Sequence, residues 1–234
     1  MTAPVELTPE EWTAVRLSLR VAVVATLASL PFGIAAAWAL ARGRFPGRAL
    51  LDGLIHLPLV LPPVVTGYVL LLGFGRRGPL GAALESCCGV VFSFRWTGAA
   101  LAAGVMAFPL MVRAIRLSLE AVDRKLEQAA GTLGASRVLV FLTITLPLAA
   151  PGIVAGMILA FAKALGEFGA TITFVSAIPG ETQTVPAAIY AYTQVPGGDA
   201  GALRLSVIAA GIALVAVVAS EILTRRVAGS GRLT

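Results

Sequence analysis

The chain has 234 residues, of which 58% are hydrophobic and only 13% charged, and its mean hydropathy is +0.90. This composition offers too little polar surface to cover a water-soluble domain, and the bases behind its net charge of +6 are scattered instead of forming the aromatic-interleaved stripe of a nucleic-acid interface. The apolar runs are continuous and of helix-spanning length, which favours an all-α, polytopic membrane bundle over a barrel.

The first helix begins with a capping signal. Thr8 can cap the helix, Pro9 suits its first position, and Glu11 can close a capping box. The apolar run 21–41 that follows can cross a bilayer core of about 30 Å, and it lacks the cleavage pattern of a removable signal peptide. The arginine-rich turn 42–48 then marks the cytoplasmic side.

The second apolar run, residues 49–74, is interrupted by prolines. Pro58, Pro62 and Pro63 remove backbone donors and should kink or break the helix. In a membrane, such a break persists where the freed carbonyls meet protein or a water-lined cavity. Two interpretations stay open, a packing kink or one wall of a translocation path. A loop that opens at residues 75–79, reaches Trp96 and contains Cys87 and Cys88 precedes the third expected span.

The third span is expected at 97–119, and the bases around all the spans indicate its orientation. A cytoplasmic excess of bases orients helices, and here the bias places the N-terminus outside and the C-terminus inside, with about five spans. Arg76 and Arg77 do not fit this scheme. The eleven bases assigned to the inside are Arg42, Arg44, Arg48, Arg113, Arg116, Arg124, Lys125, Arg137, Arg225, Arg226 and Arg232, and the six assigned to the outside are Arg16, Arg20, Arg76, Arg77, Arg95 and Arg204.

The segment 120–147 is a polar island between apolar runs. Apolar residues at three- and four-residue spacing over 119–133 predict an amphipathic helix. Gly134 can supply the positive φ that ends it, and Ser136 can cap a second helix that should stop near Pro147. The residues alone leave two alternatives open, a docking site for a partner or a hairpin lying on lipid headgroups.

The fourth span, expected at 149–165, ends in ionisable residues. Lys163 and Glu167 are four residues apart and could pair along a helix. Ionisable groups at membrane depth cost about 2.5 to 3.5 kcal/mol each, so they normally face a bundle interior or a cavity. The pair either serves a translocation path, or its two charges merely neutralise each other at the membrane edge. Thr171 and Thr173 could ligate an oxyanion or hold helices together.

The last part of the chain contains an external loop and a final span. Turn-rich residues flank a short helix expected at 187–194, and the fifth span is expected at 203–223.

The polar segment carries a long, spaced motif. Ala129 and Ala130 precede Gly134 by four residues or more, and Ile144, Leu146 and Pro147 follow in register; Gln128 and Glu127 stand immediately before the alanines. This resembles the EAA loop of ABC-importer permeases, which reads Glu-Ala-Ala, three residues, Gly, nine residues, Ile-x-Leu-Pro, with Gln128 at the position of the family's Glu. The resemblance implies coupling helices that dock on a cytoplasmic ATPase subunit. ATP and Mg would then be bound by that partner, and the chain has no Gly-x-x-x-x-Gly-Lys-Ser/Thr segment of its own.

Most of the chain resembles the molybdate importer permeases, through residues 108–116, 126–134, 166–175 and 178–182. The resemblance implies a single type I permease domain, residues 1–234, in the cell membrane, with 120–147 as its coupling loop. It further implies a homodimer, ATPase subunits and an external binding protein that delivers molybdate, with tungstate as a second substrate. The chain would bind no cofactor and would not be an enzyme. Sulfate importer permeases share the loop and are the nearest alternative. The candidate pathway residues are Pro62, Pro63, Lys163, Glu167, Thr171 and Thr173.

Two other classes of protein are disfavoured. An intramembrane enzyme needs a nucleophile with its base or a metal cluster, but His56 is the chain's one histidine, and Cys87 and Cys88 have neither a disulfide-framework count nor metal spacing. An autonomous channel needs a selectivity filter and no partner-binding loop.

Overall fold

The computed structural model describes residues 7–230, and in that part of the chain the regular elements are all helices. In chain order they are α1 (Pro9–Arg42), α2 (Arg48–Val60), α3 (Pro63–Phe74), α4 (Pro79–Cys88), α5 (Trp96–Ala121), α6 (Arg124–Thr132), α7 (Arg137–Val140), the π-helical turn η1 (Phe141–Thr145), α8 (Leu146–Leu165), α9 (Gly169–Val175), α10 (Val185–Thr193) and α11 (Asp199–Ser230).

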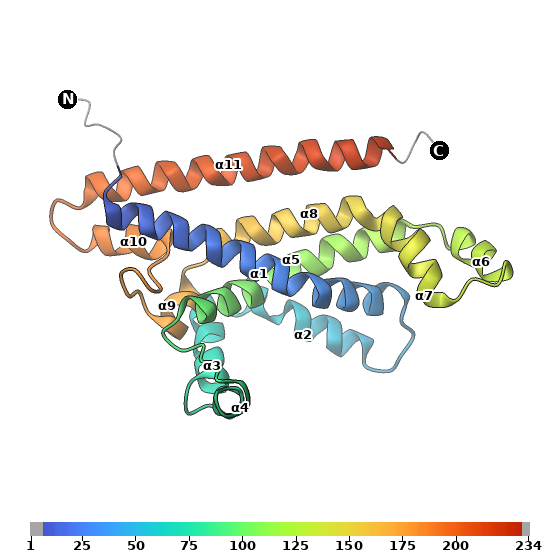
Figure 1. Ribbon diagram of the computed structural model, residues 1–234, viewed down its shortest axis with the longest axis horizontal. Coiled ribbons are helices and arrows are strands. Elements are labelled where there is room, and N and C mark those ends of the chain that lie inside the picture. The colour runs from blue at the N-terminus through green and yellow to red at the C-terminus, as the bar shows by residue number, and fades with distance from the viewer. Residues whose placement is uncertain (1–6, 231–234) are drawn as a thin grey trace.

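Long apolar helices form the body of the molecule. Helices α1, α5, α8 and α11 run along its long axis (Figure 1). Among the described residues, four helical segments are long and apolar enough to cross a membrane, and the bent pair α2 and α3 would make a fifth span. The expected number of spans therefore agrees with the structure when that pair is counted as one. The four segments are Pro9–Arg42, Trp96–Ala121, Arg137–Leu165 and Asp199–Ala219.

The core lies around α5, which packs against both α1 and α8. Its buried face is built largely from alanines, such as Ala99 and Ala102. Across the contact with α8, a Cβ at Gly152 would meet the Cβ of Ser118 at 2.1 Å, and one at Gly156 would meet the Met111 carbonyl at 3.0 Å. Lipid gives helices no hydrophobic drive to associate, so close backbone approach through small residues is what holds such spans together.

The second predicted span is divided into two helices. The break expected within 49–74 is confirmed: α2 and α3 are separated at Leu61 and Pro62 and bent by 114°. Pro58 lies inside α2 without ending it. The break comes at the adjacent prolines because the residue before a proline is driven out of the helical region, and Leu61 is extended with ψ 143°. A further helix, α4, occupies part of the segment expected to be a loop.

The predicted amphipathic helix is also divided. Helix α5 ends at Ala121, and Asp123 caps α6 by accepting the Lys125 N–H at 2.9 Å. An aspartate side chain can accept hydrogen bonds from backbone N–H groups in this way, so Asp123, a polar residue within an apolar periodicity, starts the new helix α6.

The stop expected near Pro147 is wrong. Helix α7 continues through η1 into α8, so that 137–165 form one segment. A proline ring collides with the carbonyl four residues earlier in a regular α-helix, and the wider π-helical turn just before Pro147 relieves that collision.

The elements assigned to the cytoplasm gather at one end of the molecule. The turn between α1 and α2, helices α6 and α7 and the C-terminal end of α11 lie there, whereas α9, α10 and the start of α1 lie at the opposite end (Figure 1). The start of α1 has the predicted capping box, because the Glu11 N–H donates to Thr8 Oγ1 at 3.2 Å and the Thr8 N–H donates to Glu11 Oε2 at 2.8 Å. Arg232 lies outside the described residues.

Candidate functional site

Helices α6 and α7 form a small projection at the inner end of the bundle (Figure 1). Gly134 joins them with a φ of +86°, and Ser136 caps α7 by accepting the Leu139 N–H at 3.3 Å. Both local predictions are confirmed. A left-handed residue and a cap placed two residues apart turn the chain sharply, so the two helices present their side chains outward from the membrane body.

The outer face of this projection exposes apolar side chains among polar ones. No described residue of α6 is buried, and Leu133 is 89% exposed. Exposed apolar side chains on a polar segment beyond the spans are suited to a protein partner. We call this face the coupling surface; it comprises the exposed residues Leu126, Gln128, Ala129, Leu133, Gly134, Val138 and Leu139.

Glu127 points away from the coupling surface. Its Oε1 accepts hydrogen bonds from Arg42 Nη2 at 3.0 Å and from Thr145 Oγ1 at 2.8 Å. The same Arg42 nitrogen also donates to the Val122 carbonyl at 3.2 Å. One carboxylate therefore ties α6 to the last residue of α1 and to the turn that precedes α8.

The remaining residues of the motif lie at the base of the projection. Ala130, Ile144 and Leu146 are half-buried, and Pro147 is exposed at the start of α8. They connect the projection to the span, whereas Gln128, Ala129 and Gly134 face outward.

Lys163 and Glu167 pair as predicted, with Lys163 Nζ 2.7 Å from Glu167 Oε2. The pair joins the end of α8 to the start of α9, because Glu167 Oε1 also accepts the Ala170 N–H at 3.1 Å. A carboxylate at a helix N-terminus is favoured by the helix dipole. The Glu167 side chain is 2% exposed and that of Lys163 is 32% exposed, so the cation is the accessible member of the pair.

Helices α3 and α9 approach each other closely beside this pair. A Cβ on Gly169 would lie 2.7 Å from Pro63 Cβ, and one on Gly67 would lie 2.5 Å from the Ala170 carbonyl oxygen. Thr173 shares the contact, with its hydroxyl donating to the Gly169 carbonyl at 2.8 Å. Pro63, the first residue of α3, thus lies against the start of α9, which follows Glu167.

The other candidate pathway residues occupy the same two helices. Thr171 is buried in α9, while Pro62 is exposed at the N-terminal cap of α3. The structure therefore gathers the candidates expected from the sequence around the α3–α9 contact. It adds Thr66, a buried residue of α3 whose hydroxyl has no hydrogen-bond partner among residues 7–230. A threonine within an apolar run gives no sequence signal for this position.

A second cluster of polar side chains, not predicted from the sequence, lies at the inner ends of α2 and α5. Arg116 donates from Nη1 to Asp52 Oδ2 at 3.1 Å and from Nε to Glu120 Oε1 at 2.9 Å. His56 Nδ1 lies 3.2 Å from Asp52 Oδ1, so this histidine has an acidic neighbour. With Arg113, these residues line a cavity of about 310 Å³. The four-residue spacings of Asp52 with His56 and of Arg116 with Glu120 were the available signals.

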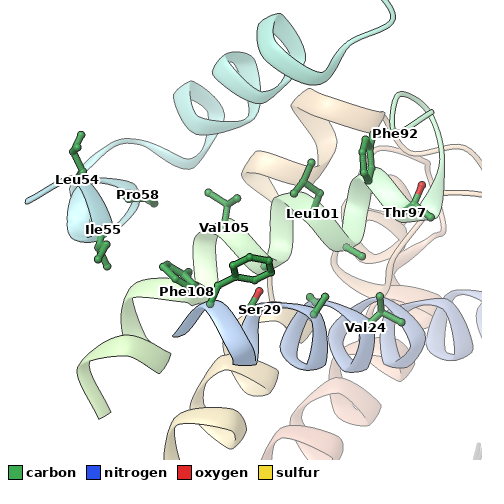
Figure 2. Close-up of a pocket in the computed structure, with 15 residues that line it drawn as sticks. Val24, Ser29, Leu54, Ile55, Pro58, Phe92, Thr97, Leu101, Val105 and Phe108 are labelled. Carbon is green, nitrogen blue, oxygen red and sulfur yellow. The ribbon is translucent and has the colours of Figure 1, made fainter. Parts of the chain in front are cut away.

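A larger cavity, of about 600 Å³, lies between α1, α2 and α5. Figure 2 shows apolar side chains around it, including Leu54, Ile55 and Phe108, with Ser29 and Thr97 as the hydroxyl-bearing members. An anion transferred into such surroundings would lose its hydration without gaining charged or amide partners. This cavity therefore suits apolar groups and does not suit an oxyanion.

No cluster of three possible metal ligands occurs within the part of the chain that the structure describes. Cys87 and Cys88 lie exposed at the end of α4, not in a loop as expected. The hydrogen bond with Cys87 raises the pKa of the Cys88 thiol, which disfavours the reactive thiolate.

Comparisons with known proteins agree on one family. The family model for the binding-protein-dependent transport system inner membrane component matches residues 29–229. The chain is 62% identical over 219 residues to the molybdenum transport system permease protein ModB of Escherichia coli K12, covering 94% of this chain and 96% of that protein. It is 38% identical over 223 residues to the sulfate transport system permease protein CysW of Synechococcus elongatus, and this match covers 94% of this chain and 76% of that protein.

Solved structures share the fold. In the crystal structure of a bacterial alginate ABC transporter in complex with an alginate pentasaccharide-bound periplasmic protein, one chain superposes with a TM-score of 0.73. The sequences are 16% identical, and the match covers 94% of this chain and 80% of that one.

Proposed function

This chain belongs to the family of binding-protein-dependent transport system inner membrane components, and from that premise we propose that it is the permease subunit of an ATP-driven importer of molybdate, with tungstate as a second substrate. The substrate is supported by the likeness to the molybdenum permease of E. coli, which is closer than the likeness to the sulfate permease and spans almost the whole of both chains.

The exposed coupling surface carries the proposal of ATP coupling. It displays Leu133 and its neighbours outside the membrane body, at the end where the predicted cytoplasmic elements gather. A separate ATPase subunit would dock there and would bind ATP and Mg. The chain is thus a transport subunit without catalytic residues of its own.

The contact between α3 and α9 is the candidate wall of the oxyanion path. Lys163 offers a partly accessible cation there, held by the buried Glu167. The bend between α2 and α3 supplies a break of the kind that lines transporter cavities. A second copy of the chain would complete the path at their interface, and an external binding protein would deliver the anion to the end that carries α10.

Transport would proceed by alternating access. Closure of the ATPase subunits on ATP would draw the coupling segments of the two copies together and rock the spans between inward- and outward-open states. The binding energy of ATP would act through displacement of α6 and α7, because this chain holds no phosphate loop.

The test is uptake of isotopically labelled molybdate into proteoliposomes containing this chain, its cognate ATPase and its binding protein. Uptake should require ATP and should be competed by tungstate more strongly than by sulfate. Gly134→Glu should abolish substrate-stimulated ATP turnover while the spans remain folded. Uptake without the ATPase would refute the importer in favour of a channel, and stronger competition by sulfate would refute the substrate.

A further inference from the structure

Glu127 is the one residue of the coupling motif whose charged group faces the bundle. Among residues 7–230, the side chains of α6 make hydrogen bonds to other elements only through this carboxylate. No described α6 residue is buried and Ala130 is only half-buried, so apolar packing fastens the helix weakly. Its attachment to the spans therefore depends mainly on Glu127 and on the chain links at its two ends.

The two partners of Glu127 belong to different spans. Arg42 is the last residue of α1, and its side chain is 12% exposed. Thr145 is 2% exposed and ends the π-helical turn that leads into α8. Charge-assisted hydrogen bonds in such partly enclosed surroundings are stronger and more directional than neutral ones. Both donors converge on one oxygen, Oε1, which leaves little freedom for α6 to move without them.

We propose that Glu127 is a positioning residue that transmits displacement of the docked α6 to α1 and α8, and that it does not itself hold the ATPase subunit. The inference rests on the proposed coupling function. When α6 is pushed by its partner, Arg42 and Thr145 move with it, so two spans are displaced as the ATPase closes. Without the carboxylate, α6 pivots on its flanking links at Asp123 and Leu133, and the spans stay behind.

The experiment compares Glu127→Ala with wild type in the reconstituted complex. The ATPase subunit should copurify in the wild-type ratio, and ATP turnover should persist. Molybdate uptake per ATP hydrolysed should fall about tenfold, within the range of coupling between distinct sites. A role confined to folding would lower the yield and both activities together, and would leave their ratio unchanged.

Two further variants keep the test decisive if Glu127→Ala folds poorly. Thr145→Val removes one of the two donors at nearly constant volume and should lower uptake per ATP by a smaller factor. The exchange Arg42→Glu with Glu127→Arg should recover part of the ratio that each single variant loses. Glu85→Ala, which removes an exposed carboxylate on α4, serves as the control and should change nothing.

Each result separates the possible roles. Loss of the ATPase subunit from Glu127→Ala would make Glu127 a docking residue and overturn the inference. An unchanged ratio of uptake to ATP turnover would also overturn it. Failure of the proposed function itself would be seen differently, as absence of ATP-dependent uptake in the wild-type complex.

Discussion

The contact between α3 and α9 can be tested with a matched pair of glycines on one helix. Gly67→Ala places a Cβ 2.5 Å from the Ala170 carbonyl oxygen and 2.9 Å from Thr173 Cβ. Gly73→Ala, on the same helix, places a Cβ where nothing lies within 4 Å. Both variants remove the same glycine flexibility from α3, so a difference between them reports the contact with α9.

The size of the effect follows from the geometry. The Ala170 carbonyl would have to retreat by about 0.9 Å to reach the 3.4 Å of ordinary contact. The Ala170 atoms are backbone and Thr173 Cβ is bonded directly to the backbone, so no side-chain rotation relieves the contact. Overpacking of this kind costs about 1 to 3 kcal/mol. The displaced segment begins three residues after Glu167, so the path proposed at this contact should be distorted as well.

The assay is thermal unfolding of the purified protein in detergent, followed by molybdate uptake in the reconstituted complex. Gly67→Ala should unfold at a lower temperature than wild type and lose most uptake. Gly73→Ala should match or exceed wild-type stability, because alanine is favoured over glycine in helices by about 1 kcal/mol. Equal behaviour of the two variants would refute the close approach of α3 to α9.

Three other outcomes follow from single positions. Gly134→Ala should destabilise the turn between α6 and α7 by about 1 to 2 kcal/mol, because the φ of Gly134 is +86°. Gly134→Asn should destabilise it less. Equal ATPase stimulation and equal sensitivity to proteolysis in the two variants would contradict this prediction. Leu133→Ala should lower the amount of copurifying ATPase subunit without lowering the yield of the permease, and unchanged copurification would remove Leu133 from the coupling surface. Thr182→Val should lower the free energy of unfolding by about 1 to 3 kcal/mol, because the buried Thr182 hydroxyl accepts the Ile178 N–H at 2.9 Å and donates to the Ser176 carbonyl at 3.0 Å. Thr13→Val replaces an exposed threonine and should not lower the free energy of unfolding.

Local signals in the sequence predicted local structure well. The capping box at Thr8 and Glu11, the cap at Ser136 and the left-handed turn at Gly134 all depend on hydrogen bonds or backbone angles within a few residues. The pairing of Lys163 with Glu167 is local in the same sense. The helix boundaries that were missed lie where two local preferences compete, at Asp123 within an apolar periodicity and at Pro147 beside a π-helical turn.

The sequence by itself determined that this is a helical membrane protein with about five spans and a polar segment at 120–147 at one end, because length, hydropathy and capping act over neighbouring residues. Only the tertiary structure decided that Glu127 faces Arg42 and Thr145, that α3 lies against α9, and that Asp52 meets Arg116. Arg42 is 85 residues from Glu127, and Arg116 is 64 residues from Asp52. Such contacts depend on how the spans pack against one another, which no short-range pattern specifies.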